Sequence, residues 1–292
     1  MIYIIPTSKT EHLANIIKKE KKIKIVFPEK NKEGKRYFPD GEIYVKIPEA
    51  EKMKKKRVVV LHSGSPEPNK GLFELEIILQ ILKDKKIKPD LFFSYFPYGQ
   101  QDKSFEKGET SVAENLIKKL VNFYKVKKIY IIDPHFGKEK WLEKYPVKTI
   151  SAVPLLIKKA RKDLGENILF LSPDKGGKRR TGIKGAEKQR LNSFEVKIFS
   201  PRENMKGKTI GVLDDIIETG GTILRFCDFL KKSEAKKIIV LASHGVLISG
   251  VNKIAKKCSK LYLTNSLEHS GFQKNKKQAT VDISKLISLE LF

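Results

Sequence analysis

The sequence predicts an α/β protein of two tandem domains, each with a mostly parallel sheet covered by helices. The chain has 292 residues, and at about 150 residues per domain this length suits two domains. Short strand-like segments alternate with amphipathic helical stretches along most of the chain. These segments are apolar throughout and not at every second position, which is typical of parallel strands covered on both faces.

The predicted elements follow one another in a regular order. In the first half we expect strands at 57–61, 90–93 and 128–132, and helices at 72–82 and 111–121. Ser111 and Glu114 have the spacing of a capping box, which places the start of the second helix. In the second half we expect strands at 168–171, 209–213, 237–242 and 260–263, and helices at 150–160, 222–230 and 252–258. The halves join near residues 145–150, so we expect an N-terminal domain of 1–147 and a C-terminal domain of 148–292.

The charge balance is strongly basic, with 60 Lys and Arg residues against 34 Asp and Glu residues and a formal net charge of +26. Only 8 of these cations are Arg, whereas readout of nucleic-acid bases favours Arg. We therefore expect a solvated lysine surface that attracts phosphorylated small molecules, and no nucleic-acid partner.

Membrane attachment and cysteine chemistry are not expected. The longest apolar runs, such as 238–242, fall far short of the roughly 20 residues of a membrane helix. The first residues lack the basic and long apolar regions of a signal peptide, so we expect a cytoplasmic protein. Cys227 and Cys258 lie far apart without neighbouring ligands, which predicts two reduced, buried thiols and neither zinc nor a disulfide.

The clearest chemical motif spans residues 210–222. An apolar strand ends in Asp214 and Asp215, and a Thr-Gly-Gly-Thr turn at 219–222 then leads into a helix. Backbone amides at a helix N-terminus, with two Thr hydroxyls, suit a phosphate, and glycines let it approach closely. The carboxylates suit sugar hydroxyls or Mg²⁺. Together they predict a site for a phosphorylated sugar; the alternative is an ordinary turn with a solvated acidic pair.

A second unusual stretch is residues 173–185, which holds four glycines, five cations and almost nothing apolar. Such a composition cannot pack into a core, and loops of this kind tend to be functional.

Segment 210–222 resembles the phosphoribosyl-binding loop of type I phosphoribosyltransferases and of ribose-phosphate pyrophosphokinases. Six further segments resemble the pyrophosphokinases in order and rough spacing: 36–42, 96–103, 133–135, 172–177, 243–246 and 263–266. Residues 187–190 are similar to the archaeal form of the family's catalytic loop. The resemblance implies two phosphoribosyltransferase-type (Rossmann-like) domains.

The resemblance also implies a nucleotide site. Phe38 would stack on the adenine of ATP, while Asp40 and Glu42 would accept hydrogen bonds from its amino group. In the family, the hairpin that corresponds to residues 36–42 reaches across a subunit interface. The resemblance therefore implies a homo-oligomer, a dimer or hexamer. Further ATP-binding positions are implied at Gln100, Gln101, Asp102 and His135.

The implied cofactor is Mg²⁺, held near His135, Asp133 and Asp174, although a histidine at a strand end is by itself more often structural. Ribose 5-phosphate would be bound by the following residues: Asp174, Asp214, Asp215, Glu218, Thr219, Gly220, Gly221 and Thr222. The implied catalytic residues are Lys188 and Arg190, whose charges would stabilise a diphosphoryl group in transfer. Plain surface charge is the alternative for this pair.

The implied reaction is transfer of diphosphate from ATP to the anomeric hydroxyl of ribose 5-phosphate. Three departures from the family pattern stand beside it: Gln100 replaces an arginine, Glu218 replaces an aspartate, and the stretch before Lys188 is short. They leave open a weakly active or inactive regulatory homologue. A nucleobase phosphoribosyltransferase is a further alternative.

Overall fold

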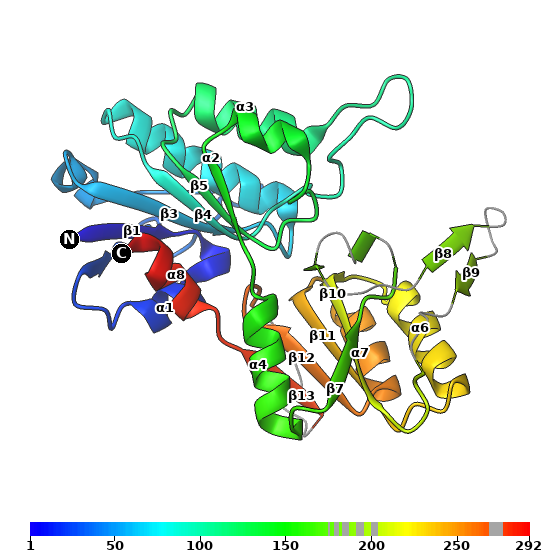
Figure 1. Cartoon of the computed structure of the whole chain (residues 1–292). Helices are drawn as coiled ribbons and strands as arrows, with labels where there is room; N and C mark the ends of the chain where they lie inside the picture. Colours follow the sequence, from blue (N-terminus) through cyan, green and yellow to red (C-terminus); the bar gives the residue numbers. More distant parts are fainter. Residues whose placement is uncertain (175, 178–180, 183–186, 191–195, 200–203, 269–276) are drawn as a thin grey trace. The chain divides into compact units, whose positions relative to one another are not determined.

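The computed structural model describes residues 1–174, 176–177, 181–182, 187–190, 196–199, 204–268 and 277–292, and the side chains of 187–190 and 196–199 lie outside this description. The chain divides into two compact units (Figure 1). The first holds residues 1–150, 266–268 and 284–292, and the second holds 151–265 and 269–283.

The first unit contains a six-stranded sheet with the order β2-β1-β3-β4-β5-β6, in which every neighbouring pair is parallel. Its strands are β1 (Ile2–Pro6), β2 (Ile23–Ile25), β3 (Arg57–Ser63), β4 (Asp90–Tyr95), β5 (Ile129–Ile132) and β6 (Val147–Ile150). Its helices are η1 (Ser8–Thr10), α1 (Glu11–Ile17), η2 (Pro48–Met53), α2 (Pro68–Asp84), α3 (Val112–Asn122), η3 (Lys140–Lys144) and α8 (Ser284–Leu291). The C-terminal helix thus returns to the unit in which the chain begins.

Both faces of this sheet are covered. Helices α2 and α3 pack their apolar sides on one face, where they form a single core with Val60, Phe93 and Ile131. Helices α1 and α8 lie on the opposite face (Figure 1). Ser111 caps α3 by accepting a hydrogen bond from the Glu114 amide, as the capping-box pattern predicts.

The second unit contains a five-stranded parallel sheet with the order β13-β12-β11-β10-β7. Its strands are β7 (Ile168–Leu171), β10 (Thr209–Ile217), β11 (Lys237–Gly245), β12 (Lys260–Thr264) and β13 (Gln278–Val281). Its helices are α4 (Val153–Leu164), α6 (Gly221–Lys232) and α7 (Ile248–Lys257). Helix α4 packs on one face, and α6 and α7 pack on the other. A separate antiparallel pair joins β8 (Glu187–Arg190) to β9 (Val196–Phe199).

The prediction of parallel sheets covered by helices is confirmed, but several strands extend beyond their expected ends, among them those expected at 57–61, 209–213 and 237–242. The strand expected to stop at residue 213 continues to Ile217, because Asp214 pairs with Ala242 and Ile217 pairs with Gly245 of β11. The two aspartates therefore lie within β10, near its carboxyl end.

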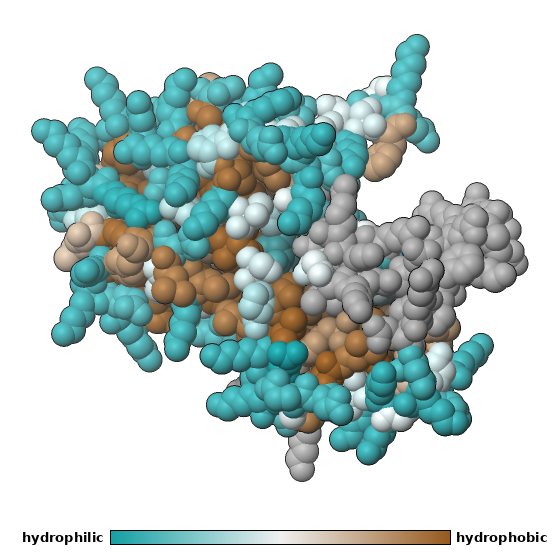
Figure 2. Space-filling model, in the orientation of Figure 1, coloured by the Kyte–Doolittle hydropathy of each residue, from teal (hydrophilic) through white to brown (hydrophobic). Residues whose placement is uncertain are grey.

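Cys227 and Cys258 are free and buried, as expected. Hydrophilic side chains project from much of the surface in view (Figure 2), which agrees with the high lysine content. No helix within the described ranges is long and apolar enough to span a membrane.

Candidate active site

The carboxyl end of β10 carries two buried acids. Asp214 is 7% exposed and Asp215 is 3% exposed, and the Asp215 amide donates a 3.0 Å hydrogen bond to the Asp214 carboxylate. Strand β10 lies inside the sheet, between β7 and β11. In open parallel sheets, ligands bind at the carboxyl ends of such strands, so the two acids stand where a substrate is expected.

The loop after β10 opens helix α6. Gly220 is the N-cap residue, with φ of 77° in the left-handed region that favours glycine, and it supplies no side-chain cap. The first turn of α6 also contains no acidic residue. Its leading backbone amides, together with exposed Thr219 and half-buried Thr222, therefore present hydrogen-bond donors and a positive helix end.

Helix α7 supports this loop at Gly250, a residue that the sequence motifs did not single out. A Cβ atom on Gly250 would lie 1.7 Å from the Glu218 carbonyl oxygen and 2.9 Å from the Thr219 carbonyl carbon. The loop backbone therefore rests directly on the helix, and only glycine allows that approach. The one sequence feature that could have indicated this contact is a glycine within a helical pattern, which often marks close packing.

Asp174 lies near Asp214, and the two carboxylates flank Gly177. Its carboxylate accepts a 2.7 Å hydrogen bond from the Gly177 amide. A Cβ atom on Gly177 would lie 3.2 Å from an Asp214 carboxylate oxygen, 3.5 Å from an Asp174 carboxylate oxygen and 2.1 Å from the Ser172 hydroxyl oxygen. The glycine thus keeps open a narrow place at which both carboxylates converge.

Lys188 and Arg190 stand on β8, opposite Ile198 and Val196 of β9. The backbone of this hairpin is described, but its side chains are not. The short stretch before it, 175–187, lies largely outside the described residues, so its predicted role is not addressed by the structure.

The predicted adenine-binding residues lie on an exposed hairpin of the first unit. The Phe38 amide donates to the Glu42 carbonyl at 2.8 Å, and the Gly41 amide donates to the Phe38 carbonyl at 2.9 Å. The Asp40 carboxylate accepts from the Glu42 amide at 3.1 Å. Phe38 is 43% exposed and contacts Tyr44 edge to face at 6.0 Å. This exposed ring beside two exposed acids can receive a planar base.

The other predicted nucleotide-binding residues follow the ends of β4 and β5. Gln100 and Gln101 are exposed, whereas Asp102 is buried and its carbonyl accepts a 2.9 Å hydrogen bond from the Ser111 hydroxyl. Asp102 therefore anchors the start of α3, while the two glutamines face solvent.

Asp133 and His135 come directly after β5, and both are half-buried. Asp133 has a positive φ of 34°, and its amide donates to the Ile150 carbonyl at 2.9 Å. They belong to the first unit and Asp174 to the second. Among the described residues, no group of three or more acid, His or Cys side chains is gathered as a metal cluster.

Comparison with known proteins finds matches in both halves of the chain. Residues 2–123 match the N-terminal domain of ribose phosphate pyrophosphokinase, and residues 173–276 match the phosphoribosyl transferase domain. The ribose-phosphate pyrophosphokinase of Pyrococcus furiosus is 31% identical over 85% of this chain and 90% of that protein. The enzyme of the same name from Sulfolobus acidocaldarius is 32% identical over 87% of this chain and 89% of that protein.

The fold matches as well. The crystal structure of phosphoribosylpyrophosphate synthetase from Mycobacterium smegmatis has a TM-score of 0.85 to this chain at 23% identity, and covers 99% of this chain and 97% of its own. The expectation of two phosphoribosyltransferase-type domains is thereby confirmed. By its matched domains and its archaeal relatives, the chain belongs to the ribose-phosphate pyrophosphokinase family of enzymes.

Proposed function

We propose that the chain transfers the diphosphate group of ATP to the anomeric hydroxyl of ribose 5-phosphate. The products are 5-phosphoribosyl 1-diphosphate (PRPP) and AMP, and PRPP feeds nucleotide biosynthesis. The observation that carries the proposal is the end of β10, where buried Asp214 and Asp215 precede a loop at the uncapped start of α6. A phosphorylated sugar matches this combination, because the amides of α6 can donate to its phosphate and the nearby carboxylates can accept from its hydroxyls.

Ribose 5-phosphate would bind at loop 219–222 and the acids around it. The 5-phosphate would accept hydrogen bonds from the first amides of α6 and from the Thr219 and Thr222 hydroxyls, with the helix dipole favouring its charge. Asp214 and Asp215 would accept hydrogen bonds from the ring hydroxyls, with Asp174 nearby. Glu218, one methylene longer than the family's usual aspartate, would take part in binding as the first residue of loop 218–222.

ATP would bind the first unit. Phe38 would stack on the adenine ring, and Asp40 and Glu42 would accept hydrogen bonds from its amino group. Their exposure supports this role, because a base can reach all three side chains. Gln100 and Gln101 would donate hydrogen bonds to the phosphates, though without the charge that an arginine would add.

The reaction is a substitution at the β-phosphorus of ATP. The anomeric oxygen forms a bond to this phosphorus, the bond from it to the α,β-bridging oxygen breaks, and AMP leaves while the hydroxyl proton passes to solvent. Lys188 and Arg190 would stabilise the negative charge on the transferring group. Positioning and charge carry such transfers, so neither residue requires an unusual pKa.

The residues of the site suit Mg²⁺, which would neutralise charge on the ATP phosphates. Mg²⁺ prefers oxygen ligands and typically takes one or two carboxylates together with substrate phosphates and water. Asp133 of the first unit and Asp174 of the second would supply such carboxylates, and His135 would hold a phosphate oxygen or the ion.

The proposal includes a homo-oligomer, a dimer or hexamer, in which the hairpin of one subunit completes the ATP site of another. It also includes a cytoplasmic location, where ATP and sugar phosphates are available. Nucleic acid is not proposed as a partner.

A catalytically weak regulatory homologue is the second candidate. It is favoured by Gln100, an exposed uncharged side chain where the family has an arginine. A nucleobase phosphoribosyltransferase is less well supported, because it would leave the exposed hairpin with Phe38 without a role.

The test is turnover by the purified protein with ATP, Mg²⁺ and ribose 5-phosphate, in parallel with Lys188→Ala. We expect AMP release that requires ribose 5-phosphate, and a kcat lowered by orders of magnitude in the variant. Silence of the wild-type protein at high concentration would favour the regulatory homologue. Release of pyrophosphate from PRPP that depends on a purine base or orotate would favour the phosphoribosyltransferase.

A further inference from the structure

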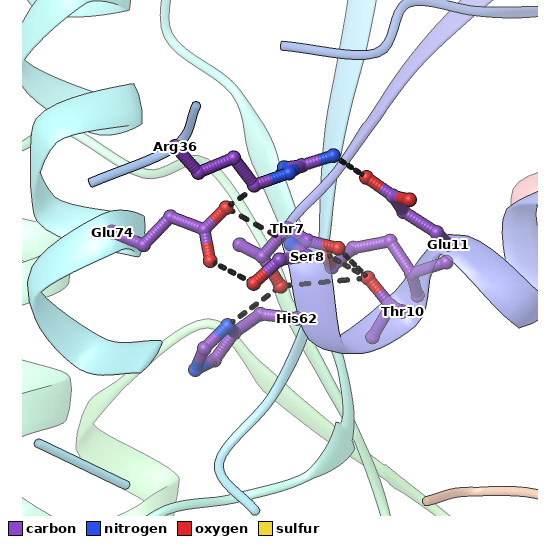
Figure 3. A network of polar contacts seen from close by, with 8 residues as sticks. Thr7, Ser8, Thr10, Glu11, Arg36, His62 and Glu74 are labelled. Carbon is purple, nitrogen blue, oxygen red and sulfur yellow. Dashed lines mark hydrogen bonds and ion pairs between the residues drawn. The ribbon is translucent and has the colours of Figure 1, made fainter. Parts of the chain in front are cut away.

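Arg36 ties the exposed hairpin to two helices of the first unit (Figure 3). Its guanidinium donates to the Glu11 carboxylate of α1, and it lies 3.8 Å from the Glu74 carboxylate of α2. Its carbonyl accepts a 2.8 Å hydrogen bond from the Tyr44 amide across the hairpin. The backbone of Arg36 thus belongs to the hairpin, while its side chain contacts helices α1 and α2.

Glu74 is a fixed anchor for this contact. It is only 4% exposed, and its two carboxylate oxygens accept hydrogen bonds from the Ser8 amide at 2.9 Å and the Ser8 hydroxyl at 2.6 Å. Burial raises the pKa of Glu74, a cost that the Ser8 bonds and the Arg36 charge oppose. Ser8 is the first residue of the short η1 turn and is separated from β1 only by Thr7, so Glu74 holds the segment after β1 to helix α2.

Besides Arg36, the hairpin has an apolar attachment near its base, where half-buried Val45 packs against the core of the first unit. It belongs to neither sheet, and it is paired only through the isolated bridges Tyr37–Ile43 and, at its base, Glu29–Lys46. The hairpin residue Tyr37 also contacts α2, because the Lys70 ammonium nitrogen lies over its ring, 5.8 Å from the ring centroid. The bridge from Arg36 to the Glu11 and Glu74 carboxylates is therefore a charged contact that joins the hairpin to both α1 and α2.

We propose that Arg36 is a positioning residue for the nucleotide site: held by Glu74 and Glu11, it sets the place of Phe38, Asp40 and Glu42 without touching ATP. The proposal rests on the function proposed above. Arginine suits this role because its planar fork reaches two carboxylates at once, whereas a lysine presents a point charge.

The matched variants are Arg36→Ala, Arg36→Lys and, as a control, Lys35→Ala, whose charge lies next in sequence and pairs only with exposed Glu33 among the described side chains. We expect Arg36→Ala to raise the KM for ATP about 10- to 100-fold, since small displacements of positioning groups have effects of this size. The KM for ribose 5-phosphate stays within about twofold, Arg36→Lys recovers part of the loss, and Lys35→Ala resembles wild type.

Titration of ATP into each protein separates this proposal from the proposed function. Weaker ATP binding by Arg36→Ala supports the positioning role even if no AMP is formed, in which case the proposed function alone fails. The positioning role would be overturned if Arg36→Ala kept the wild-type KM and affinity for ATP, or if its KM rose equally for both substrates. It would also be overturned if the wild-type protein bound no ATP. If Arg36→Ala does not fold, Arg36→Lys and Glu11→Gln take its place, with a smaller rise in the same KM expected.

Discussion

A Cβ atom on Gly250 would lie 1.7 Å from the carbonyl oxygen of Glu218, so helix α7 supports loop 218–222 by direct backbone contact. Gly250→Ala must therefore displace the loop, and displacement of a binding group by about 1 Å can cost about 10²-fold in rate. We expect the KM for ribose 5-phosphate to rise at least about tenfold while the KM for ATP changes little, measured by steady-state kinetics.

Ser249→Ala is the matched control, because Ser249 is the exposed neighbour of Gly250 on the same helix. It should leave both KM values unchanged. Wild-type kinetics in Gly250→Ala would show that the loop does not depend on this contact.

The proposed sharing of the nucleotide site between subunits predicts complementation. In that arrangement Phe38→Ala damages the hairpin that one subunit contributes to its neighbour, and Lys188→Ala damages strand β8 of the subunit's own site. A randomly mixed oligomer of the two variants should regain about a quarter of wild-type activity, because some interfaces then combine two intact parts. Activity equal to the average of the two separate variants would instead place hairpin and catalytic strand in one subunit's site.

His62 predicts a pH dependence of stability. Burial lowers the pKa of His62 to about 3, while in an unfolded chain it is about 6.5. Between these values the unfolded chain binds a proton that folded His62 does not, so the free energy of unfolding falls as the pH falls. We expect about 2 kcal/mol of the free energy of unfolding to be lost between pH 7 and pH 5, with a slope that approaches about 1.4 kcal/mol per pH unit below pH 6.5.

Urea unfolding of wild type and His62→Asn at pH 7, 6 and 5 measures this contribution. Asparagine keeps a polar atom near the Thr7 hydroxyl, which lies 3.0 Å from the His62 ring nitrogen Nδ1, but it does not titrate. The variant should lose less stability than wild type on acidification. Parallel curves for the two proteins would contradict the assignment.

The two cysteines should be inert in the folded protein. Burial raises the pKa of Cys227 to about 12 and that of Cys258 to about 11, so almost no thiolate forms at pH 8. We expect Ellman's reagent to label neither thiol of the native protein at pH 8 and both thiols in guanidinium chloride. Rapid labelling of the native protein would show that this core opens readily.

Much of the fold could be predicted because central parallel strands are continuous apolar runs. Strands such as β3, β5 and β11 can be recognised from these runs, and helices such as α3 carry an N-cap residue and a clear amphipathic pattern. The short strand β2, of three residues with a lysine at its centre, has no such signature, and only its pairing with β1 makes it a strand.

The candidate site was predictable where the chemistry lies in contiguous sequence. Loop 218–222 and Asp174 stand at the strand ends as expected, but Asp214 and Asp215 proved to be inside β10, because pairing with β11 extends the strand past two charged residues. Gly250 and the Arg36–Glu74 contact depend on residues distant in sequence that only the folded chain brings together.

The proposed function depends on a sugar phosphate binding at the start of α6, next to Asp214 and Asp215. A crystal structure of the protein with ribose 5-phosphate is the most direct test. We expect the 5-phosphate within hydrogen-bond distance of the amides of loop 219–222, with the ring hydroxyls facing the two aspartates. A loop left empty at saturating ribose 5-phosphate, or filled by side chains of the protein itself, would contradict it.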